Sequence, residues 1–207
     1  MMFVLLVEGD TEQKTLSPFL KRWLDPQLPQ PVKIEVVRFG GWSELIKDAP
    51  KKTRLFLEGP KKDEIIAIIS LLDLYGPTFY PPNLSTPDEK YDWAKKYIER
   101  KINNPKFHHF FAVHEVEAWL LSDPKLFPLE IQKAFPAKIT SPETVNFIDP
   151  PAKLLERLYP LHTRRKYKKT THGKELFSKL DPTLAYAKCP KLKLLLDKML
   201  ELAKAAK

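Results

Sequence analysis

The sequence predicts an α/β protein with a mainly parallel sheet flanked by helices. Three apolar runs of strand length, at residues 3–7, 65–72 and 107–113, each lead into acidic residues. Runs that are apolar throughout are typical of strands covered on both faces, as in a parallel sheet. Because ligands bind beyond the carboxyl ends of such strands, we expect the acidic residues at the functional edge of the sheet.

The first strand is expected over residues 3–7. Gly9 would permit a tight turn after it, and Asp10 or Thr11 would cap a helix over residues 13–23. Acidic residues at a helix N-terminus are also favoured by the helix dipole, so this tract has a structural interpretation beside a functional one.

The following elements have their own local signals. A second strand over residues 32–39 ends at two glycines, and Ser43 would cap a helix whose pattern Pro50 interrupts. β-Branched residues and a following Gly-Pro pair favour a strand over residues 65–73. A proline-rich loop, an amphipathic helix and a third strand are expected over residues 78–87, 88–103 and 107–113.

The remaining sequence predicts proline-punctuated helices and loops. It ends in a helix from about Pro190 with an apolar stripe of Leu192, Leu195, Leu196, Met199 and Leu202, which we interpret as core. We expect one domain over residues 1–207, with a core at about 1–125 and a mostly helical C-terminal addition at about 126–207.

Composition narrows the class of protein. The single cysteine, Cys189, excludes an internal disulfide framework and a cysteine-based zinc cluster and indicates a reducing compartment. The apolar runs fall short of the ~20 residues that span a bilayer, so we expect a cytoplasmic protein without membrane contact. The net charge of +9 favours a polyanion such as nucleic acid, although lysine richness is also typical of thermophile proteins.

Acidic side chains follow the three apolar runs, and parallel strands would bring them to one edge. These side chains would repel one another unless a hard divalent cation neutralised them. Oxygen ligands select Mg2+ or Mn2+, and such ions support phosphodiester cleavage. The candidate metal ligands are Glu8, Glu12, Asp73, Glu115 and Glu117.

Several tracts resemble a known family. The acidic blocks are Glu8-Gly9-x-Thr11-Glu12, Leu72-Asp73-Leu74-Tyr75-Gly76 and His114-Glu115-x-Glu117-Ala118-Trp119-Leu120-Leu121-Ser122-Asp123-Pro124. Downstream tracts follow in family order: Ser141-Pro142-Glu143-Thr144-Val145-Asn146, Pro151-Ala152-Lys153, Tyr167-Lys168-Lys169, His172-Gly173 and Cys189-Pro190. Together they resemble the Toprim-like family called domain of unknown function 4276, over nearly the whole chain.

The resemblance implies a Toprim fold, the metal-binding module of topoisomerases, bacterial primases and OLD-type nucleases. Glu8 matches the first glutamate of that module, and Asp73 matches the first aspartate of its Asp-x-Asp pair. Tyr75 stands where the second aspartate is expected, so Glu12, Glu115 or Glu117 would have to supply the missing oxygen. Family members resemble effectors of prokaryotic defence or restriction systems, including phage defence, and this implies an ATPase partner.

The basic residues of the last third form a candidate nucleic-acid face, with a solvated surface as the alternative. This face comprises Lys153, Arg157, Arg164, Arg165, Lys168, Lys169 and His172. A basic side chain near the metal would stabilise charge on the phosphate, and Lys174 is the candidate. The predicted catalytic residues are therefore Glu8, Asp73, Glu117 and Lys174.

Three functional hypotheses follow. The first is a Mg2+-dependent nuclease acting on DNA or RNA. The second is a non-catalytic nucleic-acid-binding or regulatory subunit with a degenerate Toprim site, which Tyr75 favours and a lysine-bridged acidic pocket would also favour. The third is a module that docks on an ATPase through its leucine-rich terminal helix. Zinc held by His114 and Glu117, at i and i+3 of a helix, is a less favoured alternative because the sequence has one such pair.

Overall fold

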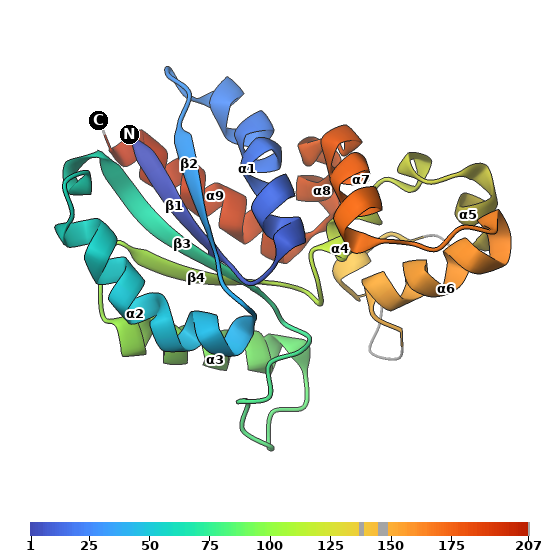
Figure 1. Cartoon of the computed structure of the whole chain (residues 1–207), viewed down its shortest axis with the longest axis horizontal. Coiled ribbons are helices and arrows are strands. Elements are labelled where there is room, and N and C mark those ends of the chain that lie inside the picture. Colours follow the sequence, from blue (N-terminus) through green and yellow to red (C-terminus); the bar gives the residue numbers. More distant parts are fainter. Residues whose placement is uncertain (137–138, 145–148, 207) are drawn as a thin grey trace.

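The computed structural model describes residues 1–136, 139–144 and 149–206 and contains a four-stranded sheet between two layers of helices (Figure 1). The strands stand in the order β2-β1-β3-β4 and are all parallel. They are β1 (Met2–Val7), β2 (Lys33–Arg38), β3 (Ile65–Asp73) and β4 (Phe107–Ala112). The predicted α/β class with a mainly parallel sheet is confirmed. Val145 and Asn146 of the family-like tract lie outside the described residues.

The three strands that lead into acidic residues are neighbours in the sheet. Leu5 of β1 pairs with Ile69 of β3, and Asp73 at the end of β3 pairs with Ala112 of β4. Every residue of β1 and β3 is buried, as their continuous apolar sequences require. The carboxyl ends of these strands therefore meet at one edge of the sheet.

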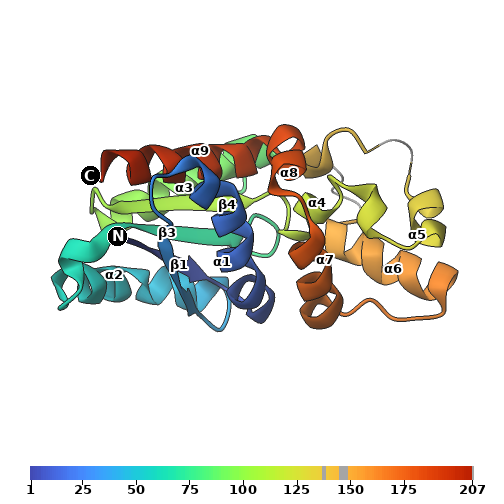
Figure 2. The ribbon, with the colours of Figure 1, turned by 90° about the horizontal axis from the view of Figure 1, so that it is seen from above.

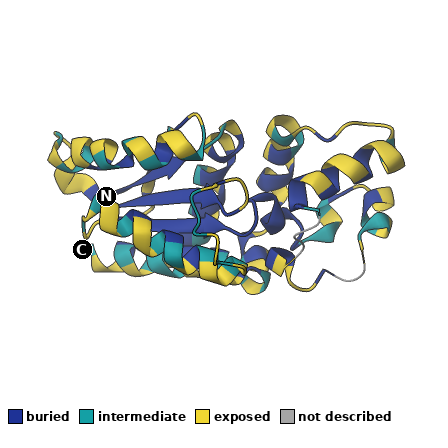
Figure 3. Cartoon of the chain, turned by 90° about the horizontal axis from the view of Figure 1, so that it is seen from below, coloured by how far each residue is buried: buried dark blue, intermediate teal, exposed yellow. Residues whose placement is uncertain are grey.

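Alternating side chains of the strands fill two separate cores. Phe3, Leu5 and Val7 pack on the side of α1 (Asp10–Leu24) and α9 (Pro190–Ala205). Their alternate neighbours in β1 pack on the opposite side, against α2 (Trp42–Glu58) and α3 (Pro87–Ile102). Figure 3 accordingly shows buried strands between helices whose outer surfaces are exposed.

The remaining helices lie beyond the carboxyl ends of the strands, and α9 then returns along the sheet (Figure 2). They are α4 (Glu117–Leu120), α5 (Leu129–Ala134), α6 (Pro151–Thr163), α7 (Lys174–Lys179) and α8 (Pro182–Lys188). Short 3-10 turns occur at Asp25–Gln27, Lys62–Glu64, Pro124–Leu126 and Pro142–Thr144, and a π-helical turn occurs at Lys169–Gly173. The expected single domain with a division near residue 125 stays a prediction.

The apolar stripe of α9 packs in the core, as predicted. Leu192, Leu195, Leu196 and Met199 are buried in the same cluster as β1 and α1. This stripe is therefore occupied within the fold and is not presented as a docking face. Among the described residues, no helix combines the length and apolar character needed to cross a membrane.

Two predicted helix caps are wrong. Helix α1 begins at Asp10 with Gly9 in the N-cap position, so Asp10 and Thr11 lie inside its first turn. Helix α2 likewise begins at Trp42, and Ser43 lies within it. In both places a glycine occupies the N-cap position. Because glycine has no side chain, neither cap makes a side-chain hydrogen bond.

The predicted interruption at Pro50 is also wrong, because α2 continues to Glu58. A proline inside a helix removes the N–H that would bond the carbonyl four residues earlier. Here the Lys101 ammonium donates to the carbonyl oxygen of Ile46 at 3.3 Å and satisfies that group. A contact from α3 thus offsets part of the cost of the proline.

Candidate metal centre

The pairing of β3 and β4 continues beyond the ends of the strands. The Leu74 N–H donates to the Ala112 carbonyl at 2.9 Å, and the Tyr75 N–H donates to the His114 carbonyl at 3.0 Å. The Val116 N–H donates to Asp73 Oδ1 at 3.1 Å. These bonds hold the segment after β4 beside Asp73.

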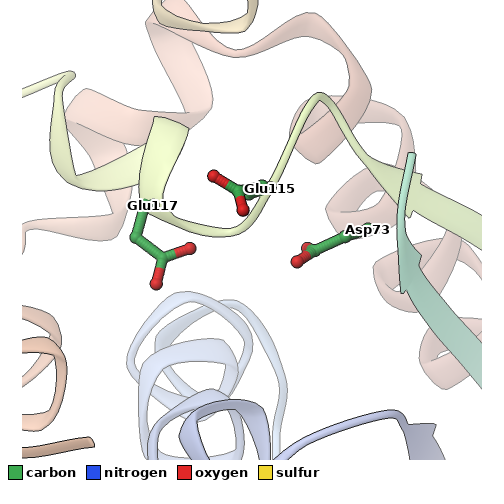
Figure 4. Close-up of side chains that lie close together, drawn as sticks. All are labelled: Asp73, Glu115 and Glu117. Atoms are coloured by element: carbon green, nitrogen blue, oxygen red, sulfur yellow. The ribbon is translucent and has the colours of Figure 1, made fainter. Parts of the chain in front are cut away.

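Three buried carboxylates meet at this edge. Asp73, Glu115 and Glu117 each offer one oxygen, and these oxygens all lie within 4.8 Å of one another. Figure 4 shows Asp73 at the end of β3, Glu115 on the loop after β4 and Glu117 at the start of α4. Both glutamates of the His-Glu-x-Glu tract therefore approach Asp73. This group contains oxygen donors and no histidine, which suits a hard cation better than zinc.

Glu115 is held by contacts from the C-terminal third. Its Oε2 accepts the Ala152 N–H at 2.9 Å, in the first turn of α6, and its Oε1 accepts from Lys169 Nζ at 3.3 Å. A carboxylate suits a helix N-terminus because it satisfies N–H groups there and complements the helix dipole. Glu115 thus attaches α6 to the acidic group.

Glu117 and Glu8 have buried oxygens that lack hydrogen-bond partners among the described residues. Both oxygens of Glu117 are of this kind, and so is Glu8 Oε2. Glu117 is only 1% exposed, and Lys169 Nζ lies 3.5 Å from its Oε1. An unsatisfied buried polar group costs about 1–3 kcal/mol, and more when it is charged. Carboxylate oxygens in this condition fit a divalent cation.

Glu12 folds back over Gly9. A Cβ atom added to Gly9 would lie 2.6 Å from Glu12 Oε2, far inside normal contact distance. The backbone of Gly9 is extended, with φ of −137°, so a side chain is excluded by this close approach and not by the conformation of a tight turn. A side chain at position 9 would therefore displace the Glu12 carboxyl group.

Burial, and after it the charges of their neighbours, raises the pKa of the acidic side chains. Burial, followed by the charge of Glu12, raises the pKa of Glu8 to about 7. Burial, with contributions from Glu115 and Glu12, raises the pKa of Glu117 to about 7. Burial and then the charges of Glu12 and Glu117 raise the pKa of Asp73 well above its usual range. Burial raises the pKa of Glu12 as well. Five carboxyl groups therefore interact at this edge of the sheet: Glu8, Glu12, Asp73, Glu115 and Glu117.

Lys169 is the cation that faces this cluster. Burial would lower the pKa of its ammonium, but Glu117, Asp73 and Glu115 outweigh that effect and raise it. Lys169 begins the π-helical turn, which packs closely on α1: a Cβ atom on Gly173 would lie 3.3 Å from Thr11 Cγ2. The sequence predicts Lys169 as part of the nucleic-acid face. The one signal that could have linked it to the acidic group is its position in the family-like Tyr167-Lys168-Lys169 tract.

The other predicted basic residues are dispersed. Lys174 is exposed at the start of α7, and no described contact joins it to the acids. Lys153 pairs with Glu156 at 3.0 Å, and Arg157 pairs with Asp149. Lys168 is exposed. Arg164, Arg165 and His172 come together around a hollow of about 650 Å3 that is also lined by Tyr159, His162 and Lys179.

The structure also shows the surroundings of three further residues from the family-like tracts. Tyr75, in the place of the second aspartate, is 57% exposed. His114 is buried, and burial lowers the pKa of its imidazole. Glu143 accepts the N–H groups of Lys191 at 2.8 Å and Leu192 at 3.1 Å, so it caps α9. The Pro-Glu-Thr tract therefore caps the N-terminus of α9, and the Cys-Pro tract forms that N-terminus.

Comparisons with known proteins show the family through a sequence model and the fold through a solved structure. A family model described as "Domain of unknown function (DUF4276)" matches residues 7–200. The C-terminal region of the Burkholderia pseudomallei OLD protein aligns with a TM-score of 0.50 and 17% identity, over 99% of this chain and 98% of that one. The C-terminal region of the Xanthomonas campestris pv. campestris OLD protein, phased with platinum, gives 0.43 and 21%, over 99% and 93%. A search of curated proteins finds no match.

Proposed function

The chain belongs to the family described as domain of unknown function 4276, and from this premise we propose that it is a Mg2+-dependent nuclease that hydrolyses phosphodiester bonds of DNA or RNA. The observation that carries the proposal is the buried group of Asp73, Glu115 and Glu117 at the carboxyl edge of a parallel sheet. Buried carboxylates at this distance repel one another unless protons or a cation compensate them. The resemblance of the sequence to Toprim nucleases supports the same reaction.

The metal would be held by Asp73 and Glu117, with Glu8, Glu12 and Glu115 around them. These residues fit a hard cation because they supply only oxygen donors, and because buried oxygens of Glu117 and Glu8 lack hydrogen-bond partners among the described residues. Glu117 and Glu115 would replace the oxygen that Tyr75 does not provide. When bound, Mg2+ or Mn2+ would supply Lewis-acid chemistry, polarising a phosphoryl oxygen and acidifying water.

The chain's own groups would complete the reaction. Glu8 and Glu117, whose pKa burial raises to about 7, would release their protons as the cation binds and would then act as its oxygen ligands. Lys169 would stabilise negative charge on the phosphate, the role that the sequence had suggested for Lys174. Lys169 is favoured because its ammonium already lies 3.3 Å from Glu115 Oε1.

Nucleic acid would be held by basic side chains of the C-terminal third of the chain. Arg164, Arg165 and Lys179 line one hollow together with His172, Glu130 and Glu175, and the three cations would contact phosphates. The net charge of +9 supports a polyanionic substrate. A role as an effector in prokaryotic defence, together with an ATPase partner, is proposed from the family resemblance alone.

Cleavage assays with a matched pair of variants test this function. Wild-type protein, alone and with any ATPase encoded beside it, is incubated with DNA and RNA in Mg2+, Mn2+ or EDTA. We expect cutting with either ion, none in EDTA, and a loss of about 100-fold or more for Glu117→Gln. Glu143→Gln is the control, because Glu143 is also buried with a pKa raised by burial to about 7 but caps α9. Uncut substrates under all conditions, or equal activity of wild type and Glu117→Gln, would refute the nuclease.

A second candidate is a non-catalytic nucleic-acid-binding subunit, and the position of Lys169 favours it. Its ammonium bridges Glu115 at 3.3 Å and Glu117 at 3.5 Å, so a lysine supplies part of the positive charge that a metal would bring. Crystals soaked in Mn2+ discriminate between the two. Anomalous density among Asp73, Glu115 and Glu117 supports the enzyme, and a lysine-bridged cluster without density supports the binding subunit.

A further inference from the structure

A second cluster of side chains at the same edge of the sheet consists of aromatic rings. The ring of Phe79 lies at its centre, with ring centroids 4.9 to 5.9 Å from those of its four neighbours. Trp42 begins α2 after β2, Phe79 and Tyr80 lie on the loop after β3, and the other two rings stand on α3. We call this cluster the aromatic platform: Trp42, Phe79, Tyr80, Trp93 and Tyr97.

Part of the aromatic platform faces solvent. Trp93 and Tyr97 are one helical turn apart on α3, and their rings stack at 5.0 Å with an angle of 9° between their planes. Tyr97 is 44% exposed. A hollow of about 390 Å3 beside them is lined by Trp93, Tyr97, Lys96, Arg100 and Lys101. A pair of parallel rings, one exposed and one partly exposed, that is flanked by cations is a surface on which flat groups can stack.

The platform adjoins the acidic group. The Tyr80 hydroxyl donates to the carbonyl oxygen of Leu74 at 2.9 Å, and Leu74 directly follows Asp73. Burial raises the pKa of the Tyr80 hydroxyl and the charge of Glu8 adds to the rise, so the two side chains lie within electrostatic reach. Prolines at 77, 81, 82 and 87 restrict the loop that carries Phe79 and Tyr80. Tyr80 therefore connects the aromatic platform to the segment that follows Asp73.

We propose that the aromatic platform binds the bases of single-stranded nucleic acid whose backbone enters the acidic group, an assignment of substrate class that rests on the proposed nuclease function. Stacking on a side chain needs an exposed base face, which a single strand offers and a duplex conceals. The lining of the hollow supports a polyanion, because it contains three cations and no acidic residue. Lys101 already donates to Ile46, which leaves Lys96 and Arg100 as the phosphate contacts.

Binding measurements in EDTA separate this proposal from catalysis, since no cleavage is required. Fluorescence anisotropy gives the affinity of the full chain for labelled oligo(dT) and for a duplex of equal length. We expect wild-type protein to prefer the single strand and Tyr97→Ala to lose about tenfold in affinity for it. Tyr97→Phe keeps the ring and should bind like wild type, and duplex affinity should be the same in all three proteins. Quenching of tryptophan fluorescence by oligo(dT) should weaken in Trp93→Phe.

Two results would overturn the platform: equal affinity of wild type for single strand and duplex, or no effect of Tyr97→Ala on oligo(dT) binding. Failure to bind any oligonucleotide also overturns it and would favour a protein ligand for the rings. If cleavage is absent but the preference for single strands depends on Tyr97, the nuclease fails and the platform stands. If metal-dependent cleavage occurs without that preference, the nuclease stands and the platform fails.

Discussion

The ammonium of Lys169 lies 3.5 Å from Oε1 of Glu117, a carboxylate that is almost fully buried and starts helix α4. Lys169 comes from a π-helical turn 52 residues further along the chain. Among the residues that the structure describes, Lys169 is the cation in contact with five interacting carboxyl groups, so the cluster keeps excess negative charge when its acids are ionised. That excess favours the binding of a cation at this edge of the sheet.

Lys169→Met should destabilise the protein and strengthen its response to metal. Removal of the ammonium leaves the acids to repel one another at neutral pH. We expect a loss of about 1–2 kcal/mol, below the range for fully buried ion pairs because 36% of the lysine side chain is exposed. Urea unfolding with and without Mn2+ measures both effects. Lys153→Met removes an exposed ion pair and should change little, and the idea fails if Mn2+ stabilises neither wild type nor Lys169→Met.

Binding of Mn2+ should release protons and become tighter as pH rises. Glu8 and Glu117, whose pKa burial raises to about 7, are partly protonated near neutrality, and a metal must displace those protons. Affinity should therefore increase from about pH 6 to about pH 8. Isothermal titration calorimetry in buffers of different ionisation enthalpy counts the released protons. A proton count of zero throughout this range would contradict the proposed ligand set.

Gly9→Ala should weaken metal binding with little effect on folding. The backbone of Gly9 is extended and accepts alanine, but the new Cβ atom would meet Glu12 Oε2 at 2.6 Å and push the carboxyl group away. The chain contains a matched control, because a Cβ atom on Gly40 would meet Glu44 Oε2 at the same 2.6 Å at the start of α2. Titration with Mn2+ should show reduced affinity for Gly9→Ala and unchanged affinity for Gly40→Ala.

Glu143 should make the stability of the fold depend on pH. Burial raises its pKa from 4.5 to about 7, so the folded protein binds this proton more tightly than the unfolded chain does. Its contribution to stability is fully present below pH 4.5 and is lost as pH rises towards 7, at about 1.4 kcal/mol per pH unit. Urea unfolding across this range should give a flatter dependence for Glu143→Gln. Parallel curves for the variant and wild type would contradict the burial of an ionisable carboxyl group there.

The sequence determined the sheet because its signals are local. The apolar run over residues 65–73 is strand β3 in the structure, and the amphipathic segment at 88–103 is α3 with a shift of one residue. Such patterns can be recognised in the sequence because each residue must suit a buried or half-buried position on a single helix or strand. The helix caps and the path through Pro50 were not predictable in this way, since Lys101 satisfies the Ile46 carbonyl from another helix.

The sequence by itself also determined which residue types carry the candidate chemistry, namely acids that follow three apolar strands. Only the tertiary structure decided their geometry. It brought both Glu115 and Glu117 to Asp73, left Tyr75 exposed, and inserted Lys169 in place of the expected Lys174. The physical reason is that these contacts join segments far apart in the chain, and their distances depend on how α4, α6 and the π-helical turn pack together.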